Sequence, residues 1–255
     1  MRLGFLGTGV IAAAMIRGLA GQGHRILVSP RNARIAAELA AEIPGVIIAP
    51  NERVVADSEV VFLCLLARDA DEVLPGLPFR AGQSVISVMV DAPLGRLRAL
   101  CAPATDIVIT IPLPPIADGG CPLPVFPASP ALEALYGARN PILPQPSEAA
   151  LSAHLGVSSL CSPILDQLLA AVDWLGAWTG DPAAAETYVA AMIRAYLPEC
   201  ARGGELAAAL DSLATEGGLN ATLRAAMAPA KDSLRHGLDG FRGRLGLPPA
   251  KAEPA

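Results

Sequence analysis

The sequence predicts an α/β protein in which a doubly wound parallel sheet of Rossmann type is followed by an all-α C-terminal domain. Two observations predict this. Short apolar runs alternate with Ala-rich segments of helical spacing over the first part of the chain, as in repeated βαβ units. The stretch 141–146 is expected to be a proline-rich link, and beyond it only helical spacing remains. We therefore expect a sheet domain at 1–146, a helical domain at 147–246 and a disordered tail at 247–255.

The expected elements follow from apolar periodicity and from helix start and stop signals. Strands are expected at 2–6, 24–28, 46–49, 59–66, 84–90 and 106–111. Helices are expected at 10–21, 32–42, just after a capping Asn51, from residue 70, and at 94–100. In the second domain, helices are expected at 148–154, 161–178, 182–201, 205–214 and 219–242.

Composition narrows the class of protein. The chain has 53% hydrophobic and 17% charged residues, which is typical of a folded domain. The net charge of −5 predicts neither a nucleic-acid partner nor an anionic membrane surface. We find no stretch of about 18 uncharged apolar residues and so expect no membrane span. The Ala-rich helical domain has few large side chains, so we expect a homodimer formed through it.

Histidine and cysteine usage predicts no metal site. The three histidines (His24, His154 and His236) are isolated, and we interpret them as structural or surface residues. Five dispersed cysteines, at positions 64, 101, 121, 161 and 200, have no metal-ligand spacing. An odd, scattered set of this kind is typical of a reducing compartment, so we expect a cytoplasmic protein.

A glycine motif follows the first strand and opens the first helix. Gly7-Thr8-Gly9-Val10-Ile11-Ala12 matches the G-x-G-x-x-G/A fingerprint. In this setting Gly7 allows the turn, Gly9 lets a pyrophosphate approach the backbone, and Ala12 lets the helix pack against the sheet. The helix N-terminus favours the negative charge of the phosphates. The alternative is a glycine turn before a core helix.

The end of the second strand indicates which dinucleotide binds. A site for NAD places Asp or Glu there to bind the ribose 2′-hydroxyl. This chain has Ser29-Pro30-Arg31-Asn32 instead. Ser29 and Asn32 can donate hydrogen bonds, and the Arg31 guanidinium can pair with a 2′-phosphate. We predict NADP(H) as the cofactor; the alternative is an ordinary polar loop.

Further cofactor contacts are expected from Asn51 and from the end of the fourth strand. Asn51 can cap a helix and also face the adenosine. Cys64, Leu65 and Leu66 end the strand beside the point where the sheet order reverses. We interpret Cys64 as a small packing residue and not a nucleophile, because no histidine lies near it in the sequence.

No catalytic motif stands out. Ser158, Ser159 and Asn220 are substrate-side candidates, because they carry polar groups near the start of the helical domain and after the glycine turn Gly217-Gly218. The serines have an alternative role as caps of a helix beginning near Ser162. The catalytic residues themselves stay unassigned.

Taken together, these segments resemble the pyrroline-5-carboxylate reductase family. The strand–turn–helix that opens the chain resembles the opening of that family, and Ser29-Pro30-Arg31-Asn32 is similar to its NADP-binding turn. Residues 51–66 and 85–88 also resemble family segments, as do Ile111-Pro112-Leu113-Pro114-Pro115 and 215–220. The resemblance implies an NADP-binding domain followed by a helical bundle that dimerises and completes the active site.

The sequence differs from the family pattern mainly at the residues expected on the substrate side of the active site. Ala67-Arg68 stands where the family has Lys-Pro, and Leu113 stands where it has Asn. Residues 157–162 replace its Gly-Ser-Gly-Pro-Ala-Tyr loop, and Leu219 and Asn220 replace two threonines. Loss of polar partners should alter specificity strongly.

Two functions fit the sequence. The first is an NADP(H)-dependent reductase, with an altered substrate site, that transfers hydride to a C=N or C=O bond of a small molecule. The second is a non-catalytic NADP(H)-binding dimer that acts as a sensor or scaffold, which the missing substrate groups favour.

Overall fold

The computed structural model describes residues 1–200, 206–213 and 215–248. The chain forms two compact units. The first is Met1–Leu155 with Leu245–Leu247, and the second comprises Gly156–Arg244 and the residues from Pro248. The predicted boundary at residue 146 precedes helix α7 (Glu148–Ser158), whereas the units divide inside it. Most of the predicted tail, residues 249–255, lies outside the described residues.

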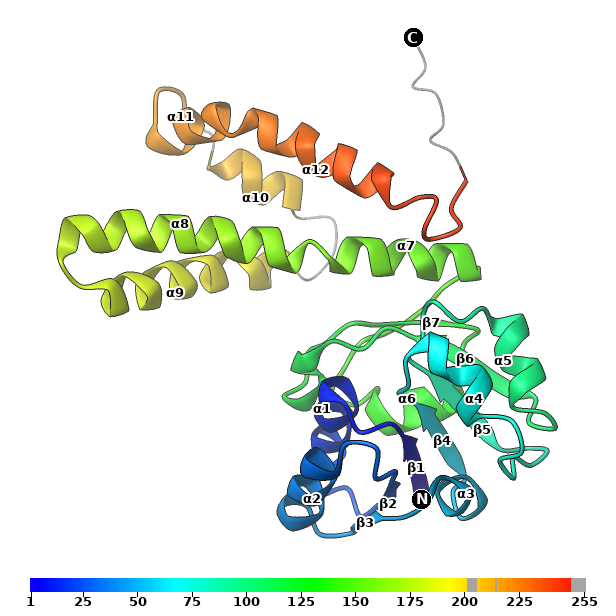
Figure 1. Cartoon of the computed structure of the whole chain (residues 1–255). Helices are drawn as coiled ribbons and strands as arrows, with labels where there is room; N and C mark the ends of the chain where they lie inside the picture. The colour runs from blue at the N-terminus through cyan, green and yellow to red at the C-terminus, as the bar shows by residue number, and fades with distance from the viewer. Residues whose placement is uncertain (201–205, 214, 249–255) are drawn as a thin grey trace. The chain divides into compact units, whose positions relative to one another are not determined.

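The first unit contains one sheet with strand order β3-β2-β1-β4-β5-β6-β7-β8 (Figure 1). All neighbouring strands are parallel except β6 and β7, which are antiparallel. The reversal of strand order beside β1 is the doubly wound arrangement that the sequence predicts, and the predicted fold class is confirmed. The strands are β1 Arg2–Leu6, β2 Arg25–Val28, β3 Val46–Ile48, β4 Val60–Leu63, β5 Ser84–Ser87, β6 Asp106–Thr110, β7 Leu123–Phe126 and β8 Ile142–Pro144.

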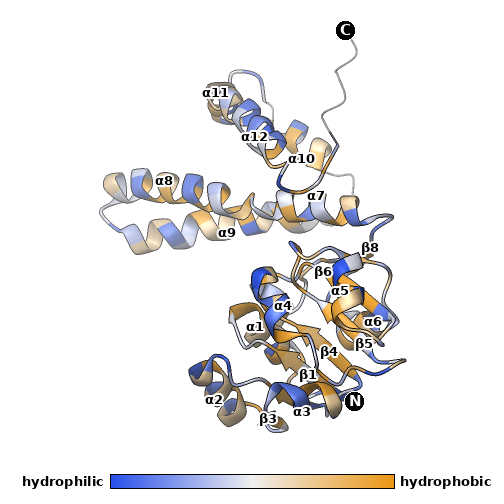
Figure 2. Cartoon of the chain, turned by 45° about the vertical axis from the view of Figure 1, so that its right-hand side comes forward, coloured by the Kyte–Doolittle hydropathy of each residue, from blue (hydrophilic) through white to orange (hydrophobic). Residues whose placement is uncertain are grey.

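Helices cover both faces of this sheet. One face packs against α1 (Val10–Gly18), α2 (Ala33–Glu42), η2 (Pro114–Ala117) and α6 (Pro130–Tyr136). The other packs against α3 (Asn51–Ala56), α4 (Ala70–Val73), α5 (Leu94–Leu100) and the start of α7. The strands are hydrophobic along their length, as Figure 2 shows for β1 and β4, and their side chains belong to a buried cluster on each face, which is typical of a sheet buried on both faces.

An aromatic cluster lies in the centre of the core. The rings of Phe5 on β1 and Phe62 on β4 stack with centroids 4.4 Å apart, and Tyr136 meets Phe62 edge-on at 6.3 Å. The buried Tyr136 hydroxyl donates a hydrogen bond to the carbonyl of Met15, 3.0 Å away. This bond ties α6 to α1, and burial raises the pKa of Tyr136 well above its usual value.

Three elements at one edge of the sheet differ from the sequence prediction. The stretch 141–146 was expected as a link, but Ile142–Pro144 forms β8 beside β7. Strand β7 and helix α6 were not expected at all. Pro122, Pro124 and Pro127 obscure the strand signal, because proline cannot donate to a sheet ladder and is confined to edges and ends.

Two predicted strands are shorter than expected, and one predicted helix cap is wrong. The strands predicted at 59–66 and 84–90 end at Leu63 and Ser87, and only the amides of Cys64 and Val88 still bond to the neighbouring strands beyond those ends. Asn51 does not cap α3; it is the first helical residue, and Pro50 holds the cap position. The ring of Pro50 restricts φ to a value that suits the extended backbone of a cap residue. The helix therefore begins one residue later, and the Asn51 side chain does not cap it.

The second unit is helical. It contains the end of α7, followed by α8 (Cys161–Thr179), α9 (Pro182–Cys200), α10 (Leu206–Ser212), α11 (Leu219–Ala226) and α12 (Ala228–Gly240). The single helix predicted at 219–242 is two helices separated at Met227. Residues 201, 205 and 214, at the predicted ends of two other helices, lie outside the described residues.

Helices α8 and α9 form an antiparallel hairpin (Figure 1). Gly180 ends α8 in the left-handed conformation, with φ 73°, the usual way for glycine to close a helix. A Cβ added to Gly176 would lie 3.2 Å from Cα of Pro182, so glycine allows the two helices to approach closely. Gly176 and Gly180 therefore favour this turn between α8 and α9.

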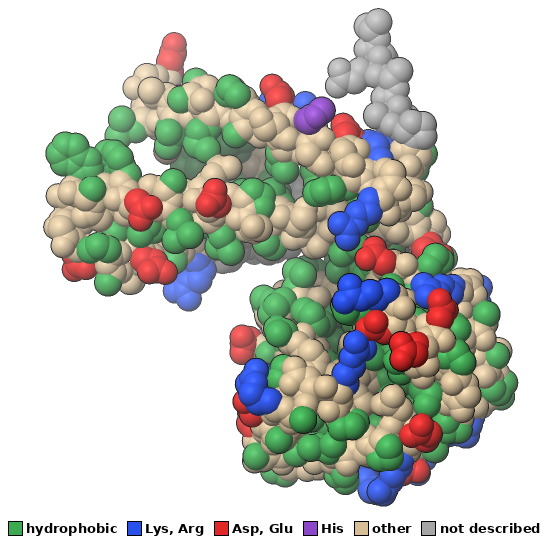
Figure 3. Space-filling model, in the orientation of Figure 1, with side chains coloured by type: hydrophobic (Ala, Val, Ile, Leu, Met, Phe, Trp, Pro, Cys, Tyr) green, Lys and Arg blue, Asp and Glu red, His purple; other side chains and the backbone are tan. Residues whose placement is uncertain are grey.

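The core of this hairpin is small. Its buried hydrophobic residues are Val172, Ala185 and Val189. By contrast, Trp174 is 66% exposed and Trp178 is 76% exposed. Figure 3 shows hydrophobic side chains over the visible surface of α8 and α9. Within the described part of the chain, the helical unit thus leaves large apolar side chains uncovered.

Among the described residues, one helical segment is long and apolar enough to cross a membrane, which the sequence analysis did not expect. It spans Glu148–Thr179 with a mean hydropathy of 1.5 over its most apolar window. That segment consists of α7 and α8, separated by a turn at Ser159 and Leu160. It also carries Asp166 and Asp173. Helices covered by other protein surfaces have the same composition.

Candidate functional site

A pocket of about 620 Å³ lies at the carboxyl ends of β1, β4 and β5 in the first unit. This is the edge at which ligands bind in open α/β sheets. Most of the predicted cofactor residues line it, together with Ala12, Ala33 and Val88, which the sequence analysis did not assign. The predicted residues in its wall are Gly7, Thr8, Gly9, Val10, Ile11, Arg31, Asn32, Cys64, Leu65 and Leu66.

The two glycines of the fingerprint have different surroundings. Gly7 has φ +93°, and a Cβ there would lie 2.3 Å from the carbonyl oxygen of Cys64, so only glycine fits. A Cβ on Gly9 would meet nothing within 4 Å. Gly7 is therefore required by the fold, whereas Gly9 leaves open space at the start of α1 where a ligand can approach the backbone.

Two helix N-termini border the pocket. Gly9 occupies the cap position of α1 and makes no side-chain cap, and Asn32 caps α2 by accepting a hydrogen bond from the Ile35 amide. Neither helix has an acidic residue in its first turn. The amide groups and the positive ends of both helix dipoles therefore favour an anion in the pocket.

Ser29 lies beneath the glycine turn and does not line the pocket. Its buried hydroxyl accepts a hydrogen bond from the Gly7 amide at 2.8 Å. The Thr8 hydroxyl donates to the Ser29 carbonyl at 3.1 Å. These bonds join the ends of β1 and β2. Asn51, another residue predicted to bind the cofactor, is also absent from the wall.

Arg31 provides the positively charged side chain in the pocket wall. Its guanidinium donates a hydrogen bond to the Asp69 carboxylate, with Nη2 and Oδ2 2.6 Å apart. Asp69 ends the short helix η1 (Ala67–Asp69), which follows β4. Sequence spacing gave no sign of this pair, because its members are 38 residues apart on different loops.

The wall formed by the strand ends is apolar. It consists of Cys64, Leu65 and Leu66 after β4, and Val88 after β5. Burial raises the pKa of the Cys64 thiol to about 12. The thiol is therefore neutral at physiological pH, as expected of a packing residue and not of a nucleophile.

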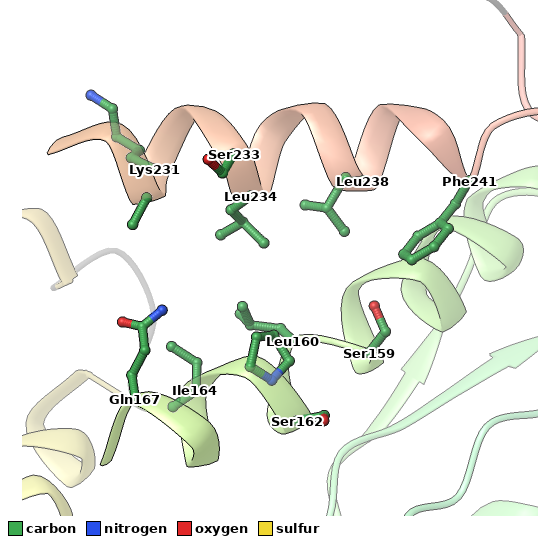
Figure 4. A pocket seen from close by; sticks show the side chains of 13 residues that line it. Ser159, Leu160, Ser162, Ile164, Gln167, Lys231, Ser233, Leu234, Leu238 and Phe241 are labelled. Atoms are coloured by element: carbon green, nitrogen blue, oxygen red, sulfur yellow. The ribbon is translucent and has the colours of Figure 1, made fainter. Parts of the chain in front are cut away.

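The substrate-side candidates lie in or beside the second unit. Ser159 borders a pocket of about 800 Å³ between the start of α8 and α12 (Figure 4). Leu160 holds the cap position of α8 without a side-chain bond, so none of the serines caps that helix. Asn220 is an exposed residue at the start of α11. Ser158 lies in the last turn of α7.

The pocket of Figure 4 is predominantly apolar. Leu234 and Leu238 of α12 face Leu160 and Ile164 across it, and Phe241 closes one end. No group of three or more His, Cys, Asp or Glu side chains that could hold a metal ion occurs in the described parts of either unit.

Comparison with known proteins supports the architecture. Residues 2–91 match the sequence model of the family described as "NADP oxidoreductase coenzyme F420-dependent". No curated protein gives a significant match to the chain.

Solved structures match over nearly the whole chain. A Plasmodium falciparum pyrroline carboxylate reductase with NADP bound is 14% identical, with a TM-score of 0.79; the match covers 96% of this chain and 97% of that one. A Coxiella burnetii pyrroline-5-carboxylate reductase is 17% identical with a TM-score of 0.80 and the same coverage. A reductive aminase from Aspergillus terreus, in complex with NADPH4, cyclohexanone and allyl amine, is 16% identical, with a TM-score of 0.63 and coverage of 96% and 92%.

These likenesses and the strand order agree with the resemblance inferred from the sequence. The identity is low, so the likeness establishes architecture. The chain has the fold of the pyrroline-5-carboxylate reductases, with a first domain that matches the NADP oxidoreductase family model over residues 2–91.

Proposed function

We propose that this protein is an NADP(H)-dependent reductase that transfers hydride to the C=N bond, or to a C=O bond, of a small substrate. The observation that carries the proposal is the pocket at the carboxyl ends of β1, β4 and β5. It combines an open glycine turn, two helix N-termini and a guanidinium with an apolar wall. Phosphates suit the first three features and a nicotinamide ring suits the last.

The proposed placement of the cofactor follows from these features. Gly9, Val10 and the α1 amides hold the pyrophosphate, and Arg31 and Asn32 face the 2′-phosphate of the adenosine. Leu65 and Val88 contact the nicotinamide half. When bound, the reduced nicotinamide supplies the hydride. The chain's own residues bind, orient and exclude water around it.

The residues at the strand ends also indicate the polarity of the substrate. Leu65 and Leu66 beyond β4 and Val88 beyond β5 form the apolar part of the pocket wall, where we place the nicotinamide. None of these can pair with a carboxylate, which needs a cation or several hydrogen-bond donors. We therefore propose an apolar imine, and not an amino-acid-derived carboxylate, as the substrate class.

A second copy of the chain is proposed as the cover of the helical unit. Support comes from its small core and from exposed apolar residues such as Trp174, Trp178 and Leu219, which is 90% exposed. The helical domain, taken as 147–246, would then dimerise, and the sheet domain, taken as 1–146, would bind NADP(H). Ser158, Ser159 and Asn220 remain the proposed substrate-side residues.

The test is a turnover assay that follows NADPH absorbance. We expect oxidation with apolar cyclic imines and at most slow oxidation with pyrroline-5-carboxylate. Gly9→Ala is the control, because the structure has room for the methyl group whereas a pyrophosphate at the turn does not. Absence of turnover with any imine or ketone would contradict the reductase proposal.

The cofactor preference has its own test. Arg31→Ala should weaken NADPH binding by about tenfold or more and leave NADH binding nearly unchanged, because only NADPH carries the phosphate that a guanidinium pairs with. Isothermal titration with both cofactors measures this. Equal losses for the two would refute the 2′-phosphate role of Arg31.

One observation favours a non-catalytic NADP(H)-binding dimer as the second candidate. Within the fully described wall of the cofactor pocket, Arg31 is the one charged side chain, and the Cys64 thiol has a pKa near 12. The wall therefore offers no ready proton donor. Tight NADPH binding without turnover on the whole substrate panel would support this function over the reductase.

A further inference from the structure

We propose that Asp69 is a specificity-determining residue of the cofactor site, because its carboxylate holds Arg31 in the free protein and competes with the 2′-phosphate for it. The inference rests on the proposed NADP(H) site. It makes the preference for the phosphorylated cofactor a balance between two anions, one on the protein and one on the ligand.

The geometry places this ion pair at the rim of the pocket. Arg31 lines the pocket, and its Nη2 lies 2.6 Å from Oδ2 of Asp69. The Asp69 amide donates a hydrogen bond to the carbonyl of Leu66, itself a pocket residue, at 2.9 Å. This bond holds the backbone of Asp69 next to the pocket wall.

The two partners differ in freedom. The Arg31 side chain is 50% exposed, whereas that of Asp69 is 20% exposed. A long, half-exposed guanidinium can turn from one anion to another, while the short carboxylate is held by its backbone. Asp69 also forms a longer ion pair with Arg68, whose Nε is 3.8 Å from Oδ1 and whose side chain is 81% exposed. Arg31 is thus the mobile partner.

Electrostatics then decides the sign of the effect. In the free protein the carboxylate neutralises the guanidinium, so the rim attracts a dianionic phosphate less than Arg31 alone would. A phosphate beside Arg31 also lies near the Asp69 charge, and like charges repel. A cofactor without the 2′-phosphate leaves the pair intact. Asp69 should therefore weaken NADPH binding and leave NADH binding unaffected.

The test is Asp69→Asn, which removes the charge and keeps the shape. We expect the affinity for NADPH to rise about two- to fivefold, the range typical of partly exposed ion pairs. The affinity for NADH should stay at the wild-type value. Asp71→Asn is the matched control: Asp71 lies two residues away and pairs with Arg96, with 2.5 Å between Arg96 Nη2 and Asp71 Oδ2. Titration calorimetry reports both affinities without any need for turnover.

A double-mutant cycle separates competition from other roles. In an Arg31→Ala background, Asp69→Asn should no longer raise NADPH affinity. A fall in NADPH affinity in the single variant would overturn the proposal, because Asp69 would then position Arg31 for the phosphate. A gain that persists without Arg31, or an unresponsive Asp69→Asn in a protein that binds NADPH, would also overturn it. A wild-type protein that binds neither dinucleotide would instead refute the proposed function, and this inference with it.

Discussion

The two units of this chain bury their apolar residues to very different extents. In the sheet unit, Phe5, Phe62 and Tyr136 are fully or almost fully buried within clusters that cover both faces of the sheet. In the helical unit the buried cluster is Val172, Ala185 and Val189. The first unit has a core of its own, whereas the second leaves much apolar surface exposed.

The two units also contribute to the proposed function in different ways. The sheet unit builds its pocket from backbone that packing fixes, such as the turn at Gly7 against the carbonyl of Cys64. The helical unit contributes polar candidates on exposed helix ends, such as Asn220. We therefore expect mutations in the first unit to change folding or cofactor binding. Mutations in the second should change assembly or, at the proposed substrate-side residues, turnover.

The largest expected effect is the loss of a core aromatic. Phe62→Ala should lower the free energy of unfolding by about 3–5 kcal/mol, because it removes a buried ring and leaves a cavity against Phe5 and Tyr136. Chemical denaturation measures the change. Trp178→Ala, measured at low protein concentration, is the matched control and should have an effect within about 0.5 kcal/mol, as an exposed site does. Similar losses of unfolding free energy in both variants would contradict the difference in burial between the two units.

The second effect distinguishes the two glycines of the fingerprint. Gly7→Ala should destabilise the fold by about 2 kcal/mol or more, because of its positive φ and the clash with the Cys64 carbonyl. Gly9→Ala should keep the wild-type melting temperature and lose NADPH affinity. Thermal melts and cofactor titration on both variants check this. A destabilised Gly9→Ala protein would show that open space at Gly9 is not the reason for glycine there.

The third effect concerns assembly. Trp178→Glu should weaken the proposed dimer by about tenfold or more, because an aromatic anchor becomes a charge. Sedimentation across a range of concentrations measures the dissociation constant. Ile48→Glu, at a 42% exposed apolar residue of the first unit, is the control and should leave the dimer intact. A wild-type chain that is monomeric throughout would refute the dimer.

The smallest effect is a pH dependence in the sheet unit. The Arg2 amide donates to the Glu59 carboxylate at 2.7 Å, and this bond lowers the pKa of Glu59. The stabilisation is present above the unfolded-state pKa and is lost as pH falls through the lower, folded-state pKa. Glu59→Gln should therefore be less stable than wild type near neutral pH, with a difference that shrinks in acid. Unfolding curves at several pH values test this, and a difference that grows in acid would contradict it.

Much of the fold and part of the site could be predicted from local sequence. The glycine turn, the flanking strand and helix, and the apolar strand ends are encoded by neighbouring residues. Other features depend on distant partners: β8 needs β7 beside it, and the Arg31–Asp69 pair joins loops 38 residues apart. Asn51 was predicted to cap α3, but Pro50 holds that position. Ser29 was expected in the pocket, but its hydroxyl supports the Gly7 amide.

By itself, the sequence determined a doubly wound sheet with a glycine turn between β1 and α1, because hydrophobic periodicity and glycine spacing are local properties. Only the tertiary structure decided which predicted residues share one pocket, that Asp69 faces Arg31, and that the helical unit leaves its large apolar side chains uncovered. The reason is physical. Contacts between distant segments form only after the chain has packed, and burial depends on every element that covers a side chain.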